Sequence, residues 1–286
     1  MISVRFLINP SSGKGDRKRA IKHLLSSKSL LELQVEVLYS QNAAHLKKLA
    51  SAAVLDAIDV VVAAGGDGTV NIVASQLVNS EVALAILPWG SGNGLASHIG
   101  FTDSVTRMTS ILKQPKFSFI DVGDVNHHYF FQNFALGLPA TVIHRYNSTA
   151  GQGLKKYLCC TAATILKRLD STIQSTDNTR PYQSLLVANS KFLGYGISLT
   201  PRASLQDGQL RVVGAYSKVN LFFRSMATLI FRKDYSRSLS ELKIDSSPSV
   251  KAQIDGEIAA VSPPYEIRTH HKALKIVLPD SLSMLE

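Results

Sequence analysis

The sequence IDVVVAAGGDGTVN, residues 58–71, places a buried strand directly before a glycine-rich loop. Residues 58–64 form a nearly continuous β-branched and apolar run, which is typical of a parallel strand buried on both faces. A short helix is predicted after the loop, near residues 70–78. Ligands of open α/β sheets bind outside the carboxyl ends of the strands. This stretch therefore predicts an α/β fold with a ligand site at residues 65–71.

The composition of this loop indicates a phosphate ligand. Three glycines, at positions 65, 66 and 68, let the backbone approach a phosphate closely and point N–H groups at it. The following helix adds its favourable dipole, and Asp67 is placed to hold Mg²⁺ or to contact a ribose or a water molecule. A tight strand-to-helix turn would need only one or two glycines, so a turn without a ligand is the weaker interpretation.

Two further glycine-bearing loops follow predicted strands. NPSSGKG, residues 9–15, comes after the apolar run at residues 2–8, and PWGSGNG, residues 88–94, comes after the run at residues 82–87. The first loop is not a Walker A motif, because it lacks the Gly-Lys-Ser/Thr ending. Three such loops after three parallel strands would line one edge of the sheet, and this coincidence supports a nucleotide site.

The pattern of the chain changes after about Gln114-Pro115. Before this point strands and helices alternate, with helices predicted at residues 16–27 and 42–55. Beyond it short strand-like runs dominate, at residues 116–125, 128–136, 182–188, 209–216, 239–245, 250–254 and 265–269. We expect an N-terminal three-layer α/β nucleotide-binding domain at residues 1–117. A second, β-rich sandwich domain is expected at residues 118–286, whose last residues could return to the first domain.

Composition and charge limit the classes of partner. Only 18% of the 286 residues are charged, so disorder is excluded. The formal net charge of +10 favours an anionic partner, and a basic surface without a specific partner is the alternative. No nucleic-acid partner is expected, because aromatic residues are only 7% and no basic-aromatic motif occurs.

Location is predicted from the cysteines and from hydropathy. The two cysteines, Cys159 and Cys160, are adjacent and cannot build a disulfide framework, which fits a reducing, cytoplasmic compartment. No run of eighteen apolar residues occurs, so any membrane contact is expected to be peripheral, at the inner membrane face. Two helical stretches, residues 153–169 and 219–232, have apolar faces with basic flanks. They suit an anionic membrane surface or, equally, the core of the second domain.

Five motifs, in order along residues 4–278, resemble the diacylglycerol kinase catalytic-domain family, which includes sphingosine kinases and soluble bacterial lipid kinases. They are Asn-Pro-x-Ser-Gly-x-Gly at residues 9–15, Gly-Gly-Asp-Gly-Thr-x-Asn at 65–71, Gly-Ser-Gly-Asn at 90–93, Asp-Gly-x-Leu at 207–210 and Asp-Gly-Glu at 255–257. The resemblance implies an ATP-dependent kinase that uses Mg²⁺. Its acceptor would be the hydroxyl of a lipid alcohol, such as diacylglycerol or a sphingoid base, at a membrane surface.

The resemblance also assigns roles to individual residues. The expected ATP contacts are Asn9, Ser40, Gly65, Gly66, Asp67, Gly68, Thr69, Asn71, Gly90, Ser91, Gly92 and Asn93. Asp67 would work catalytically at the phosphates with Mg²⁺, and Glu257 would be the general base that removes the lipid hydroxyl proton. Asp207, with the carbonyls of Leu205 and Leu210, would form a structural metal site. Asp255 is either a companion of Glu257 or a residue of an Asp-Gly turn.

Departures from the family pattern keep other functions open. Ile72 stands where members often have Glu, and Pro139 stands where many carry Asp. These two positions motivate a catalytically weak homologue that only binds lipid or nucleotide. NAD kinases and phosphofructokinases also use Gly-Gly-Asp-Gly, but the motifs at residues 9–15 and 90–93 argue against them. A homodimer is possible on sequence grounds.

Overall fold

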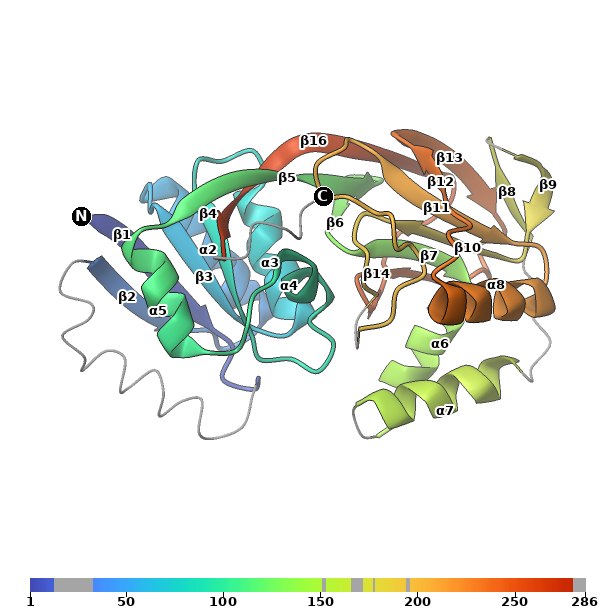
Figure 1. Cartoon of the computed structure of the whole chain (residues 1–286), viewed down its shortest axis with the longest axis horizontal. Coiled ribbons are helices and arrows are strands. Elements are labelled where there is room, and N and C mark those ends of the chain that lie inside the picture. The colour runs from blue at the N-terminus through green and yellow to red at the C-terminus, as the bar shows by residue number, and fades with distance from the viewer. Residues whose placement is uncertain (13–32, 151–152, 166–171, 177, 194–195, 280–286) are drawn as a thin grey trace. The chain divides into compact units, whose positions relative to one another are not determined.

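The computed structural model describes residues 1–12, 33–150, 153–165, 172–176, 178–193 and 196–279 (Figure 1). The helix predicted at residues 16–27 lies outside them, as do Gly13-Lys14-Gly15 of the first loop. The chain divides into two compact units, one of Met1–Ile120 together with the described residues from Lys272 onward, the other of Asp121–His271. Two strands, β5 (Lys116–Val125) and β16 (Tyr265–Leu278), pass from one unit to the other.

The first unit contains a parallel sheet in the order β2-β1-β3-β4. The strands are β1 (Ile2–Ile8), β2 (Leu33–Tyr39), β3 (Val60–Gly65) and β4 (Ala83–Pro88). Every residue of β3 and β4 is buried, which confirms the strand buried on both faces that the β-branched run predicts. The end of β16 pairs in parallel with β4, at Ile276 and Leu84.

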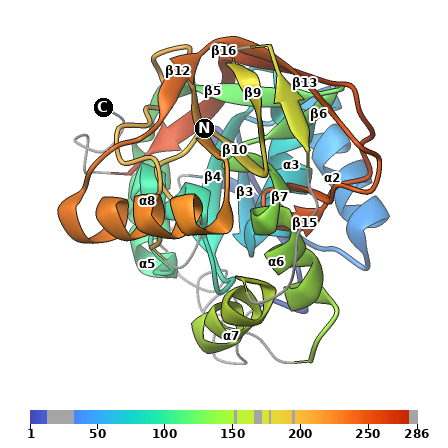
Figure 2. The ribbon, with the colours of Figure 1, turned by 90° about the vertical axis from the view of Figure 1, so that its right-hand side faces the viewer.

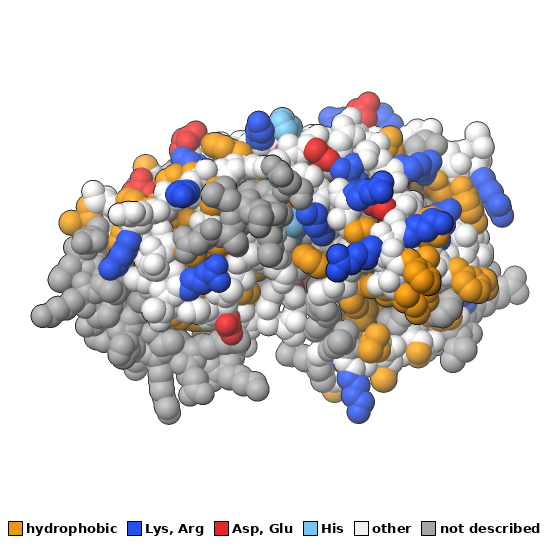
Figure 3. Space-filling view, in the orientation of Figure 1, with side chains coloured by type: hydrophobic (Ala, Val, Ile, Leu, Met, Phe, Trp, Pro, Cys, Tyr) orange, Lys and Arg blue, Asp and Glu red, His pale blue; other side chains and the backbone are white. Residues whose placement is uncertain are grey.

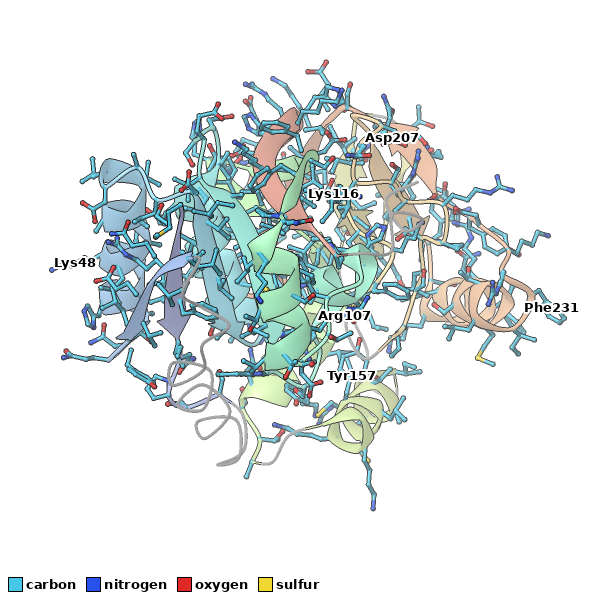
Figure 4. The ribbon with its side chains drawn as sticks, turned by 60° about the vertical axis from the view of Figure 1, so that its left-hand side comes forward. Lys48, Arg107, Lys116, Tyr157, Asp207 and Phe231 are labelled. Atoms are coloured by element: carbon cyan, nitrogen blue, oxygen red, sulfur yellow. The ribbon has the colours of Figure 1, made fainter. Side chains whose placement is uncertain are left out.

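Helices cover both faces of this sheet. They are α2 (Ala43–Leu55), α3 (Asp67–Leu77), α4 (Gly94–Ile99) and α5 (Val105–Lys113). In Figure 4 the sheet lies between α2, which carries Lys48, and α5, which carries Arg107, so the expected three layers are present. The α2 and α5 helices begin at Asn42 and Ser104, whose side chains accept N–H groups of the first turn. The sequence patterns did not predict α4 and α5.

The second unit is a β-sandwich. One sheet is antiparallel in the order β12 (Arg237–Leu239), β11 (Leu210–Ala215), β10 (Ser184–Ala188), β7 (Asn133–Gly137), β14 (Ala252–Ile254) and β15 (Glu257–Ile258). The other strands are β6 (His128–Phe130), which pairs with β5, and β8 (Ile173–Ser175), β9 (Asn178–Tyr182) and β13 (Glu241–Ser246), which pair in series beside β16. Phe134 and Leu185 of the first sheet share one core with Ile244 and Tyr265 of the second, so the β-rich sandwich is confirmed.

Three helices accompany these strands: α6 (Leu138–Asn147), α7 (Leu154–Ile165) and α8 (Lys218–Phe231) (Figure 2). Leu138 and Val142 of α6 pack on Cys160 of α7. The sequence patterns did not predict α6, although Pro139 stands in its first turn, where proline fits a helix. None of the described helices combines the length and the apolar character that crossing a bilayer requires.

Candidate active site

Three loops meet at the carboxyl edge of the parallel sheet in the first unit. They follow β1, β3 and β4, as the sequence predicts. The Asn9 N–H donates to the Ala64 carbonyl at 3.0 Å, and the Trp89 N–H donates to the Gly65 carbonyl at 2.8 Å. The Asn9 amide also donates to the Thr69 hydroxyl, with 3.1 Å between Nδ2 and Oγ1. The loops are therefore fixed to one another by hydrogen bonds as well as by the strands.

Glycine is required where two of these loops touch. A Cβ atom on Gly90 would lie 2.5 Å from the Gly66 Cα, closer than nonbonded carbon atoms approach. Within the second loop, a Cβ atom on Gly65 would lie 2.4 Å from the Thr69 Oγ1. The N-cap residue of α3 is Gly66, which has no side chain to cap the helix. The first-turn N–H groups of α3 have no acceptor within the helix, and such a helix start binds anions well. This arrangement can receive phosphate oxygens.

Asp67 fastens the third loop to the second. Its Oδ2 accepts the Asn93 N–H at 2.7 Å, and its Oδ1 accepts the Gly94 N–H at 2.9 Å. Asn93 has a left-handed backbone, with φ of 51°, and its side chain bonds both the N–H and the carbonyl of Gly90. The sequence did not predict this positioning role of Asp67, because the role depends on which loop lies beside it. Asp67 is half-buried, and a carboxylate is the type of ligand that Mg²⁺ prefers in proteins.

The remaining nucleotide candidates differ in their surroundings. Ser40 is buried, and its N–H and hydroxyl both donate to the Ile8 carbonyl, at 2.9 and 3.3 Å. It therefore joins the ends of β1 and β2. Asn71 and Ile72 are half-buried in α3, whereas Ser91 is exposed in the third loop.

In the second unit, Glu257 begins β15 directly after a tight hairpin turn. The turn residues Asp255 and Gly256 both have positive φ, 48° and 84°, as a two-residue hairpin of this kind requires. Glu257 is exposed, so its carboxylate can meet a substrate.

Asp255 anchors this hairpin. Only 6% of the residue is exposed, and its carboxylate accepts three backbone N–H groups, from Phe131 at 2.9 Å and from Gln132 and Asn133 at 2.8 Å. This favours the turn role that the sequence left open for Asp255. It also explains why the single strand predicted at residues 128–136 is divided into β6 and β7: the amides between them bond a side chain.

The donors expected to form a structural metal site have protein partners. The Asp207 carboxylate pairs with the Arg211 guanidinium and accepts the Gln209 N–H. The Leu205 carbonyl accepts the Asp121 N–H at 2.6 Å, and Leu210 lies within β11. Among the described residues, no cluster of three or more His, Cys, Asp or Glu side chains could hold a metal. As arranged, these residues do not fit a metal ion, because a cation already neutralises the only carboxylate of the set.

A neighbouring contact between Asp121 and His271 was not predicted. Asp121 is fully buried, and its Oδ1 lies 2.8 Å from Nδ1 of His271. Its Oδ2 accepts the Gly208 N–H at 2.6 Å. His271 belongs to β16. The His271 side chain is half exposed, yet its Nδ1 contacts the buried Asp121 carboxylate. The same carboxylate accepts the N–H of Gly208, the residue after Asp207.

Metal removal tests the Asp207 arrangement. We expect EDTA to leave the thermal midpoint of the nucleotide-free protein unchanged, and Arg211→Ala to lower the free energy of unfolding by about 1–3 kcal/mol, as loss of charge-assisted hydrogen bonds does. Arg268→Ala removes an exposed arginine paired with Glu266 and serves as the control, with a change within about 0.5 kcal/mol. A fall of the wild-type midpoint in EDTA that Mg²⁺ restores would instead place a structural ion here.

Comparisons with known proteins find relatives of this chain. Residues 3–125 match the family described as the diacylglycerol kinase catalytic domain. A protein of Yersinia enterocolitica named "Probable lipid kinase YegS-like" is 25% identical over 96% of this chain and 96% of its own length. The "Diacylglycerol kinase" of Bacillus subtilis is 25% identical over 98% of this chain and 97% of its own.

The solved structures agree on the fold. A crystal structure described as a diacylglycerol kinase from Bacillus anthracis strain Sterne superposes with a TM-score of 0.79 at 17% identity, covering 98% of both chains. At this identity the likeness concerns the fold alone. The matched domain contains all three glycine-bearing loops of the first unit and the fastening residue Asp67. The chain is therefore similar to the diacylglycerol kinase catalytic domain through its residues 3–125, and to proteins named as lipid kinases along nearly its whole length.

Proposed function

We propose that this chain is an ATP-dependent lipid kinase, which transfers the γ-phosphoryl group to the hydroxyl of diacylglycerol, a sphingoid base or a similar lipid alcohol. The proposal rests on the three loops at the carboxyl edge of the parallel sheet. There the carboxylate of Asp67, at the start of α3, accepts N–H groups of the loop at residues 90–94. The family match and the names of the relatives support a kinase that acts on lipids.

The first unit would hold ATP. Backbone N–H groups at the start of α3 and in the loop at residues 90–93 would bind phosphate oxygens, and Asn9 would contact the nucleotide beside Thr69. Mg²⁺ would be held through Asp67, and when bound it would neutralise charge on the phosphates. Because Asp67 also positions the third loop, its replacement would disturb both the loop and the ion.

The second unit would supply the general base. Glu257 would accept the proton of the lipid hydroxyl as that oxygen forms a bond to the γ-phosphorus. The bond between the γ-phosphorus and the bridging oxygen to the β-phosphate breaks, and ADP leaves. Alcohols are poor nucleophiles at neutral pH, so a positioned carboxylate contributes about 10²- to 10⁴-fold. The hairpin anchor at Asp255 keeps Glu257 in place.

The setting of the reaction follows from its substrate. A lipid alcohol with long acyl chains stays in a bilayer, so the enzyme would work peripherally at a membrane surface, in a cytoplasmic compartment and within phospholipid metabolism. The net charge of +10 favours an anionic surface. A homodimer stays a prediction.

A panel of acceptors tests the function. Wild-type protein with ATP and Mg²⁺ is offered diacylglycerol, a sphingoid base, monoacylglycerol and NAD in separate reactions. We expect phosphate in one of the lipid acceptors and none in NAD. Phosphorylation of NAD would support an NAD kinase-like enzyme instead. Binding of ATP without transfer to any acceptor would support the catalytically weak homologue that Ile72 and Pro139 suggest.

A further inference from the structure

The outer face of α8 is apolar. Six of its described side chains are large, hydrophobic and exposed: Val219, Phe223, Met226, Leu229, Ile230 and Phe231. Four of them, at positions 219, 223, 226 and 230, follow helical spacing and form one continuous stripe. Phe223 is 66% exposed and Ile230 is 60% exposed. We call the six residues the α8 apolar face; Figure 4 shows Phe231 at its end.

The opposite side of α8 packs against the rest of the second unit. Leu221 packs against the cluster of α6 and α7. The Arg224 Nη1 donates to the Gly214 carbonyl at 2.6 Å, and the buried Thr228 hydroxyl lies within hydrogen-bond distance of the carbonyls of Arg224 and Lys233. Rotating the helix to bury the apolar face would break these contacts. The α8 apolar face is therefore not a core surface that packs inward, and such a concentration of exposed apolar side chains marks an interaction site.

The charges on and next to α8 indicate what binds to the α8 apolar face. The helix Lys218–Phe231 contains no Asp or Glu, and the exposed Arg232 and Lys233 follow its end. Figure 3 shows hydrophobic side chains gathered over α8 with Lys and Arg side chains beside them. An apolar stripe with basic neighbours fits the surface of an anionic bilayer. A second copy of this chain fits less well, because its own α8 would bring Arg232 and Lys233 toward another cationic helix.

We propose that the α8 apolar face inserts into the surface of an anionic membrane and holds the enzyme there. The proposal rests on the proposed function, since a lipid kinase must reach an acceptor that stays in the bilayer. Phe223 and Ile230 would lie among the acyl chains near the headgroups, while Arg232 and Lys233 would meet anionic headgroups. The proposed partner is thus the lipid surface itself. The residues that would bind it lie outside the nucleotide loops and away from Glu257 in sequence.

The first test is co-sedimentation with vesicles of phosphatidylcholine, with or without phosphatidylglycerol. Wild type is expected to bind the anionic vesicles, and the double variant Phe223→Ser, Ile230→Ser to lose about tenfold or more in affinity, as loss of inserted apolar groups predicts. Arg232→Gln with Lys233→Gln should weaken binding to anionic vesicles only. The matched control is Leu55→Ser in the first unit, an apolar residue that is 85% exposed, and it should bind like wild type. Equal vesicle binding by wild type and the serine double variant would overturn the proposal.

A second measurement separates docking from catalysis. The serine double variant should lose activity on diacylglycerol in vesicles and keep wild-type activity on a short-chain, water-soluble diacylglycerol, which also shows that it folds. If wild type binds vesicles through α8 and transfers no phosphate, docking stands and the kinase proposal falls. If both proteins act equally on vesicles, docking falls and the kinase proposal stands. A wild-type dimer that the serine double variant dissociates, without a change in vesicle binding, would assign the face to a second copy instead.

Discussion

Replacing Glu257 by Gln is expected to lower kcat by about 10²- to 10⁴-fold, the range that a positioned general base contributes. Glutamine keeps the size of the side chain but cannot take the proton from the lipid hydroxyl. The KM for ATP should change little, because the nucleotide loops belong to the other unit. The thermal midpoint should also stay unchanged, because Glu257 is exposed at the start of β15.

The matched control for this variant is Glu241→Gln, an exposed glutamate at the start of β13 in the same unit. It removes the same charge from the same sandwich and should keep wild-type kcat. Steady-state kinetics at several pH values should show the ionisation of the general base in wild type and in Glu241→Gln. The same ionisation should be missing from the pH profile of Glu257→Gln. Full activity of that variant would remove Glu257 from the mechanism while leaving the nucleotide site untouched.

Replacing Asp255 by Ala is expected to have the largest effect on stability. The change leaves three backbone N–H groups, of Phe131, Gln132 and Asn133, without their buried acceptor. Each such donor costs about 1–3 kcal/mol when it stays unsatisfied. Alanine also disfavours the positive φ of 48° at this position. We expect a loss of about 3–5 kcal/mol in the free energy of unfolding of the second unit, measured by urea denaturation.

Two companion variants define this effect. Asp255→Asn keeps one acceptor oxygen and tolerates the left-handed backbone, so its loss should be smaller, about 1–3 kcal/mol. Asp245→Ala removes an exposed aspartate of β13 and should change stability by less than about 0.5 kcal/mol. If Asp255→Ala melts like wild type but loses all activity, Asp255 acts on the substrate, and the anchor role is wrong.

The sequence predicted best what local patterns determine. The β-branched run at residues 58–64 has a composition that suits a buried strand. The glycines at 66 and 90 allow two backbones to approach closely, and Gly65 leaves room for the Thr69 side chain. The three layers and the sandwich followed from the order of such runs. By contrast, α6 has few helix signals beyond Pro139, and its apolar residues pack on a helix that follows it in sequence.

Side-chain roles within the site were harder to predict, because they depend on partners far away in the chain. Asp67 could be read as a ligand for Mg²⁺, but its bonds to the amides of Asn93 and Gly94 needed the neighbouring loop in place. Similarly, Asp207 has a metal-like motif, and only the fold shows Arg211 beside it. His271 and Asp121 stand at opposite ends of the second unit in sequence.

Transfer of the γ-phosphoryl group is tested most directly by following the label from ATP into lipid. Wild-type protein and lipid vesicles are incubated in parallel with ATP labelled at the γ-phosphate and ATP labelled at the α-phosphate, and the lipid-soluble radioactivity is measured. We expect γ-label to enter the lipid fraction and α-label to stay out of it, because one phosphoryl group moves and ADP leaves. Label from the α-position in the lipid, or no γ-label in any lipid alcohol of the panel, would contradict it.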